Sequence, residues 1–122
     1  MPVVDFSKLN FVNKVSDYNG GAYMIECFAT WCPPCKAQIP HLAEMTKKFP
    51  NVYIVSVSTE APEAVNNLKG KMVKMAEYNV ATDAAGEIQK LMTDQGVGGI
   101  PHCFIYDAND KMIASCHPGE AD

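Results

Sequence analysis

The chain has 122 residues, a formal net charge of -4, and a composition that is 48% hydrophobic and 20% charged. These values are typical of a single globular domain over residues 1–122 and argue against a disordered or fibrous protein. Proteins that bind a phosphate backbone usually carry a basic face, so the acidic balance argues against nucleic acid as a partner. No apolar run approaches the roughly 20 residues that cross a bilayer. We therefore expect a monomer with no nucleic-acid partner and no membrane partner.

The spacing of apolar residues predicts helices that alternate with strands. Phe11, Val15 and Tyr18 recur at helical spacing and predict a short helix before the Asn-Gly-Gly turn that follows. The later elements expected, in chain order, are a buried strand over 22–29, a helix over 33–49, a strand over 52–57, a helix over 61–69, a short strand over 77–80, a helix over 84–94, and two strands over 102–106 and 111–116.

Single residues set the expected boundaries of these elements. Pro40 lies inside the second helix and should kink it, because proline has no N–H to donate. Gly70 should end the helix over 61–69, and Asp83 should cap the helix over 84–94. Residues 107–110 have the composition of a tight hairpin turn. Strands separated by helices and closed by a hairpin predict an α/β fold with a mixed central sheet and helices on both faces.

The sequence Trp-Cys-Pro-Pro-Cys-Lys at residues 31–36 carries the chemistry, because it lies where a buried strand leads into a helix. A cysteine at a helix N-terminus faces unpaired N–H groups and the positive end of the helix dipole, and both stabilise a thiolate. Cys32 is therefore the expected nucleophile. Cys35 follows one turn later, where its sulfur can reach Cys32 and resolve a mixed disulfide. The pair predicts a cycle between dithiol and disulfide.

Three features together resemble the thioredoxin superfamily: the WCPPCK sequence after a strand, Pro40 inside the next helix, and Gly99-Ile100-Pro101 before a hairpin. The resemblance covers roughly residues 22–116. Because of the extra stretch at 84–94, it is closest to the TlpA/ResA-like branch, whereas tryparedoxins are similar at CPPC alone. It implies a thioredoxin fold, with the peptide bond before Pro101 in the cis form and that loop beside the reactive cysteine.

The resemblance also implies roles for other residues. Ile100 would offer backbone groups to an extended substrate, and Trp31, Pro33 and Pro101 would complete the contact surface. Glu26 matches the position of the buried acid of the family, which assists proton transfer at the resolving cysteine. A buried carboxyl group has a raised pKa and exchanges protons near neutral pH. The alternative for Glu26 is a strand residue that faces solvent.

These features predict a thiol-disulfide oxidoreductase that reduces protein disulfides and needs no metal or organic cofactor. Its partners would be proteins with disulfides and an upstream electron donor, such as a reductase or a small thiol. A cytoplasmic setting is expected, because the additional cysteines and the missing signal peptide favour a reducing compartment. A periplasmic or extracytoplasmic setting is the alternative if a signal or anchor segment was removed.

The chain departs from the family pattern at three points. Two prolines separate the cysteines where thioredoxins have Gly-Pro, and this pair tunes the reduction potential, so the direction of electron flow stays open. Ser56 and Ser58 lie on the strand where classical thioredoxins carry a lysine, so Glu26 has less charge compensation. The chain stops soon after Cys116, where the family usually adds a helix, so the fold is either minimal or truncated.

Two other interpretations stay open. The cysteine pair is compatible with half of a zinc site. Further zinc ligands would come from Cys27, Cys103, Cys116, His41 or His102. Alternatively, a redox-inert module with the same fold would hold extended peptides on the surface around Trp31 and Ile100. In the redox interpretation, Cys27 and Cys103 are small buried hydrophobes and Cys116 is more exposed.

Overall fold

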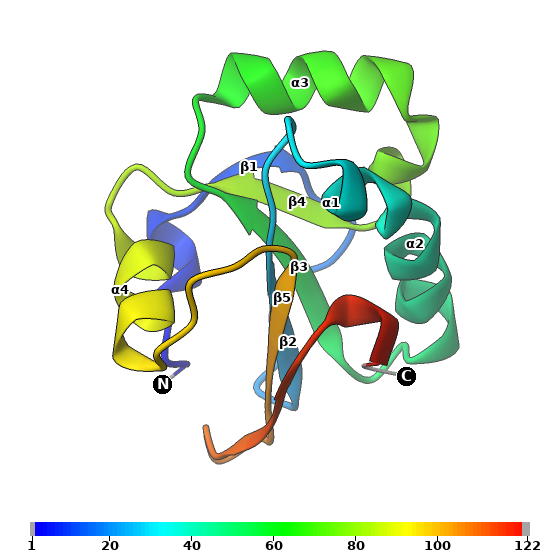
Figure 1. The fold of residues 1–122 in the computed structure, drawn as a ribbon. Coiled ribbons are helices and arrows are strands. Elements are labelled where there is room, and N and C mark those ends of the chain that lie inside the picture. The colour runs from blue at the N-terminus through cyan, green and yellow to red at the C-terminus, as the bar shows by residue number, and fades with distance from the viewer. Residues whose placement is uncertain (1, 121–122) are drawn as a thin grey trace.

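The computed structural model describes residues 2–120 and contains a six-stranded sheet with the order β1-β4-β3-β2-β5-β6. Figure 1 shows α4 on one side of this sheet and α1 and α2 on the other. The strands and α-helices, in chain order, are β1 (Asn10–Asn13), β2 (Tyr23–Cys27), α1 (Pro33–Ala37), α2 (Ile39–Lys48), β3 (Tyr53–Ser58), α3 (Pro62–Lys71), β4 (Asn79–Thr82), α4 (Glu87–Asp94), β5 (His102–Tyr106) and β6 (Met112–Cys116).

The sheet is mixed, because β2, β3 and β4 run parallel while β1, β5 and β6 are antiparallel to their neighbours. Every residue of β2, β3 and β4 is buried. Strands covered by helices on both faces need apolar side chains in both directions, which explains their nearly continuous apolar sequences. The predicted mixed sheet with helices on both faces is confirmed.

Two apolar clusters lie on the two faces of the sheet, because successive side chains of a strand point in opposite directions. The cluster beneath α1, α2 and α3 includes Cys32, Cys35 and Cys103. The cluster beneath α4 includes Cys27 and Phe104. The two cysteines of the CPPC sequence therefore share a face with Cys103 and are separated by the sheet from Cys27.

The helix predicted from Phe11, Val15 and Tyr18 is wrong. Residues 10–13 instead form β1, an edge strand that pairs antiparallel with β4. Val12 packs against one apolar cluster and Phe11 against the other, which is the alternation of a strand. Pairing with the free edge of β4 outweighs the helical spacing of three side chains, because tertiary hydrogen bonds override local propensity.

The long helix predicted over 33–49 is interrupted at Gln38, between α1 and α2. Pro40 lies in the first turn of α2, where its missing N–H costs nothing, but its ring would clash with the Lys36 carbonyl of a continuous helix. The N–H of Gln38 therefore donates to the carbonyl of Cys35 at 3.1 Å, and the N–H of Leu42 donates to the carbonyl of Gln38 at 2.9 Å. The predicted kink is confirmed as a break.

Other boundaries differ by a few residues from those expected. Helix α3 passes through Gly70, and the strand expected at 77–80 is β4, preceded by a short 3-10 helix. Helix α4 begins later than the predicted Ala84. Asp83 nevertheless holds its first turn, because its carboxylate accepts a hydrogen bond from the N–H of Ile88 at 2.7 Å.

Strands β5 and β6 form the predicted hairpin. The carboxylate of Asp107 fixes the turn by accepting hydrogen bonds from the N–H groups of Asn109 at 2.8 Å and Lys111 at 3.0 Å. An irregularity between Ile105 and Tyr106 shifts the pairing of the two strands. Within residues 2–120, no helix has both the length and the apolar character that a membrane crossing requires.

Candidate active site

Cys32 occupies the N-cap position of α1, at the end of the loop that follows β2. Its Sγ accepts a hydrogen bond from the N–H of Cys35 at 3.3 Å. The same Sγ lies 3.9 Å from the carbonyl oxygen of Ile100, to which the thiol can donate. A backbone N–H directed at the sulfur stabilises negative charge there. The predicted position of Cys32 at the start of a helix is confirmed.

Cys35 lies in the first turn of α1 and is 2% exposed, against 4% for Cys32. Burial and a hydrogen bond with Cys32 raise the pKa of the Cys35 thiol. Cys35 therefore holds its proton at neutral pH, while the sulfur of Cys32 receives a backbone N–H. A thiol that keeps its proton, next to a sulfur that accepts a backbone N–H, is the arrangement that a resolving cysteine and a nucleophilic cysteine need.

Three of the four predicted substrate-contact residues reach the surface around Cys32. Trp31 is 70% exposed, Pro33 is exposed, and Ile100 is half-buried. The peptide bond between Ile100 and Pro101 is cis, as the resemblance implies. Pro101 is buried, as Cys32 is, so its part in substrate contact stays a prediction.

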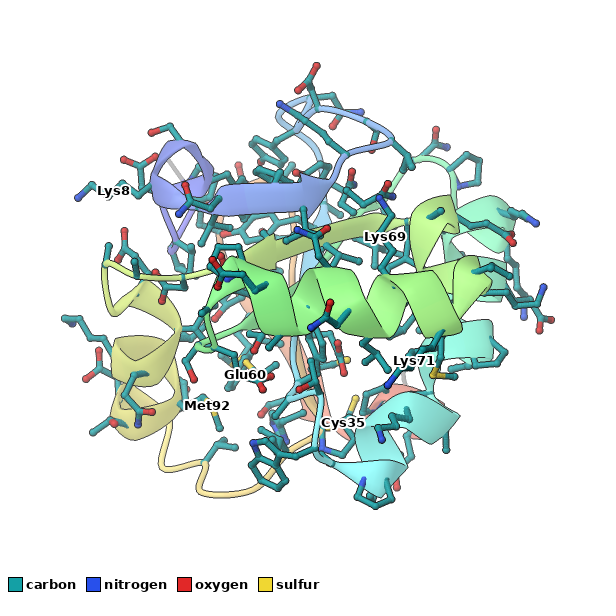
Figure 2. All side chains as sticks on the ribbon, turned by 90° about the horizontal axis from the view of Figure 1, so that it is seen from above. Lys8, Cys35, Glu60, Lys69, Lys71 and Met92 are labelled. Atoms are coloured by element: carbon teal, nitrogen blue, oxygen red, sulfur yellow. The ribbon has the colours of Figure 1, made fainter. Side chains whose placement is uncertain are left out.

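A cavity of about 250 Å³ opens on the α4 side of Trp31, the residue directly before Cys32. Trp31 and Ile100 line it together with Glu60 and Met92. In Figure 2, Glu60 lies between α4, which carries Met92, and α1, which carries Cys35. The cavity gives the contact surface a recess next to the exposed indole.

Glu60 is a site residue that the sequence did not reveal. Its carboxylate accepts hydrogen bonds from the N–H and hydroxyl of Thr30, both at 2.7 Å, and from the hydroxyl of Ser58 at 2.8 Å. Burial alone would raise the pKa of Glu60, but these hydrogen bonds outweigh burial and hold the pKa below its usual range. The ionised carboxylate therefore fixes the loop directly before Trp31. No sequence motif marks this role, because Thr30 belongs to a distant segment.

Glu26 on β2 is 1% exposed and stands in register with Ser56 on β3 and Cys103 on β5. Among the described residues, neither carboxyl oxygen has a hydrogen-bond partner of normal geometry. Burial raises the pKa of Glu26 to about 7, and the nearby Ser56 hydroxyl opposes this shift only in part. The charge of Glu26 also raises the pKa of Cys35. The predicted burial of Glu26 is confirmed, and the solvent-facing alternative is wrong.

The described part of the chain contains no set of ligands that would support the zinc interpretation. Within residues 2–120, no three His, Cys, Asp or Glu side chains are grouped so that they could hold a metal ion. The two candidate histidines contact other groups: His102 hydrogen-bonds to the Ser115 hydroxyl at 2.7 Å and His41 to the Pro118 carbonyl at 3.1 Å. Cys27 is buried, as expected.

Comparison with known proteins identifies the family. The model of the AhpC/TSA family matches residues 4–115. A curated relative, the thiol-disulfide oxidoreductase ResA of Oceanobacillus iheyensis, is 37% identical over 101 residues, which cover 81% of this chain and 50% of the relative. The chain spans about half the length of the curated relatives it matches.

Solved structures show the same fold. The thioredoxin domain of a thiol-disulfide oxidoreductase from Bacteroides vulgatus superposes with a TM-score of 0.67 at 18% identity, over 79% of this chain and 69% of that one. A thiol-disulfide isomerase from Corynebacterium glutamicum gives a TM-score of 0.71 at 16% identity, over 96% of this chain and 83% of that one. The expected thioredoxin fold and the resemblance to ResA-like proteins are confirmed, and the chain belongs to the AhpC/TSA family.

Proposed function

We propose that this chain is a thiol-disulfide oxidoreductase that reduces protein disulfides through Cys32 and Cys35. The observation that carries the proposal is the hydrogen bond from the N–H of Cys35 to the Sγ of Cys32 at the N-cap of α1. This contact stabilises a thiolate on Cys32 and holds Cys35 within one helical turn of it. The ResA relatives are named thiol-disulfide oxidoreductases, which supports thiol-disulfide exchange at this pair.

The proposed reaction has two exchange steps. The Cys32 thiolate attacks one sulfur of a substrate disulfide, so that the substrate S–S bond breaks and its other sulfur leaves and takes up a proton. Cys35 then loses its proton and attacks the sulfur of Cys32, which releases the second substrate thiol and leaves a Cys32–Cys35 disulfide. An upstream reductase or small thiol restores the dithiol. The sulfur pair itself stores the two electrons, so the proposal needs no bound metal or organic cofactor.

Glu26 is proposed to assist the second step by accepting the proton of Cys35. Burial raises the pKa of Glu26 to about 7, so that both protonation states are populated near neutral pH. A group with such a pKa serves both as an acceptor during oxidation and as a donor during reduction. The absence of a lysine on β3, where Ser56 faces Glu26, leaves burial as the main cause of this pKa.

The substrate is proposed to be an extended protein segment that carries a disulfide. Cys32 is only 4% exposed, so the substrate sulfur has to come close to the surface that surrounds it. Trp31 and Pro33 are exposed there, and the backbone of Ile100 lies against the sulfur. An extended segment can pair its backbone with Ile100 while a side chain enters the cavity beside Trp31.

The variant Cys35→Ser is expected to trap a covalent adduct between Cys32 and a disulfide-containing protein such as insulin. Serine cannot resolve the mixed disulfide, so the adduct should accumulate and disappear after addition of dithiothreitol. Non-reducing electrophoresis and mass spectrometry measure it. The control Cys32→Ser/Cys35→Ser should form no adduct. A redox-inert peptide-binding module predicts unchanged binding and no covalent adduct with Cys35→Ser, and that result would contradict the proposal.

The reduction potential of the Cys32/Cys35 pair is expected to lie near that of thioredoxin, about -270 mV, because the proposed direction is reduction of substrates. Titration against thiol-disulfide buffers, followed by alkylation and mass spectrometry of the tryptic peptide 15–36, gives the value. A potential near about -120 mV would reverse the direction and assign the chain to the oxidants that introduce disulfides. The same measurement tests the reducing setting expected from the sequence.

A further inference from the structure

The two remaining cysteines on the CPPC side of the sheet are direct neighbours. Cys103 on β5 and Cys116 on β6 are partners in the antiparallel register of the hairpin. Residues opposite each other in such a pair point to the same face, with Cα atoms about 4.5 or 5.5 Å apart depending on the type of pair. Disulfides join Cα atoms about 4.4 to 6.8 Å apart. The register therefore places these two residues at a Cα separation that a disulfide can bridge.

The pair also has unequal access to solvent. Cys103 is 0% exposed and belongs to the apolar cluster beneath α1, whereas Cys116 on the edge strand is half-buried. Burial and the charge of Glu26 raise the pKa of the Cys103 thiol, and a charge on Cys116 adds to this shift, which agrees with the register of the two strands. One accessible thiol beside one protected thiol is the arrangement in which the first can attack and the second can resolve.

We propose that Cys103 and Cys116 form a second redox-active pair, which a small-molecule disulfide such as oxidised glutathione converts into a cross-strand disulfide. The Cys116 thiol loses its proton and attacks one glutathione sulfur, which breaks the S–S bond and releases one molecule of glutathione thiol. The Cys103 thiol then attacks the sulfur of Cys116 and releases the second glutathione, protonated, as a thiol. Two protein thiols are oxidised, and one glutathione disulfide is reduced to two thiols.

The place of this pair in the sheet connects it to the CPPC site. Ser56, Glu26, Cys103 and Cys116 follow one another in register across β3, β2, β5 and β6. Oxidation puts a disulfide on the strand next to Glu26 and ties the edge strand β6 to the sheet. The inference does not rest on the proposed reductase function, because it involves neither Cys32 nor Cys35.

The test uses the variant Cys32→Ser/Cys35→Ser, so that the CPPC pair cannot take part. The folded variant is incubated with oxidised glutathione, denatured, alkylated and digested with trypsin, which cleaves after Lys90 and Lys111. The expected product joins peptide 91–111 to peptide 112–122, and dithiothreitol separates them. Cys27, on the opposite face, is the internal control and should be fully alkylated.

Matched variants keep the result decisive. In the same background, Cys103→Ser should stop at a glutathione adduct on Cys116, and Cys116→Ser should stay unmodified. A stable glutathione adduct on Cys116 with Cys103 present, a link between Cys116 residues of two chains, or no oxidation would each overturn the inference. If the double variant does not fold, as judged by circular dichroism, the same joined peptides are sought in the unmodified chain, and their absence there also overturns it.

Discussion

Replacing Cys32 with serine is expected to reduce the rate of protein-disulfide reduction to the uncatalysed background. A serine hydroxyl is not ionised at neutral pH, so the N–H of Cys35 that supports the sulfur of Cys32 has no thiolate to stabilise. The turnover of insulin disulfides with dithiothreitol as the electron source measures the effect. Loss of the first step also removes every later one, so no partial activity should remain.

The matched control is Cys116→Ser. Cys116 is half-buried on the edge strand β6, it does not line the cavity beside Trp31, and the proposed reaction does not use it. This variant should keep its turnover and lose little stability, because its side chain is only partly buried. Retained turnover in Cys32→Ser, or equal losses in both variants, would contradict the assignment of Cys32 as the nucleophile.

The variant Glu26→Gln is expected to remove a pH dependence of the free energy of unfolding that amounts to about 3 kcal/mol. Burial raises the pKa of Glu26 in the folded chain to about 7, from an ordinary value of 4.5. The folded state therefore binds this proton more tightly than the unfolded state. The corresponding stability is fully present below pH 4.5 and is lost as the pH rises through about 7.

Denaturant unfolding of both proteins between pH 4 and pH 8 measures this difference. The two curves should run together near the acidic end and separate as the pH rises, with Glu26→Gln the more stable protein above neutral pH. The turnover of Glu26→Gln should also be slower and lose its pH-dependent limb near pH 7, because an amide accepts no proton from Cys35. Parallel curves across the whole range would contradict the raised pKa.

Glu60→Gln is the control variant, because the contribution of Glu60 to the free energy of unfolding should change with pH in the opposite direction to that of Glu26. Hydrogen bonds from Thr30 and Ser58 hold the pKa of Glu60 below its usual range despite its partial burial. The stability that Glu60 contributes is therefore present above its ordinary pKa and is lost only as the pH falls. Glu60→Gln should be less stable than the unmodified chain at neutral pH, whereas Glu26→Gln should be more stable there.

Local patterns were enough to predict the parts of the site that lie close together in the sequence. The buried strand β2, the turn into α1 and the position of Cys32 all follow from one stretch of apolar residues and one Cys-Pro-Pro-Cys sequence. The burial of Glu26 followed from its apolar neighbours in the strand. The fold class followed from the alternation of strands and helices, because a mixed sheet is the arrangement that covers such strands on both faces.

Contacts between segments that are distant in the sequence could not be predicted from local patterns. β1 exists because the edge of β4 accepts it, and Glu60 fixes the active-site loop through Thr30, which comes from a different element. The pairing of Cys103 with Cys116 depends on the irregularity between Ile105 and Tyr106. Continuing the pairing of Tyr106 with Met112 without that shift would place Ser115 opposite Cys103.

The exposure of Trp31 has an optical consequence. It is the one tryptophan of the chain, it is 70% exposed, and it directly precedes Cys32. Its emission should respond to the oxidation of the neighbouring sulfur pair, because a disulfide close to an indole quenches its fluorescence. The same exposure makes it a poor reporter of unfolding, since the indole is already in water in the folded chain. We therefore expect fluorescence to report the redox state of this protein without a label, and circular dichroism to report its stability.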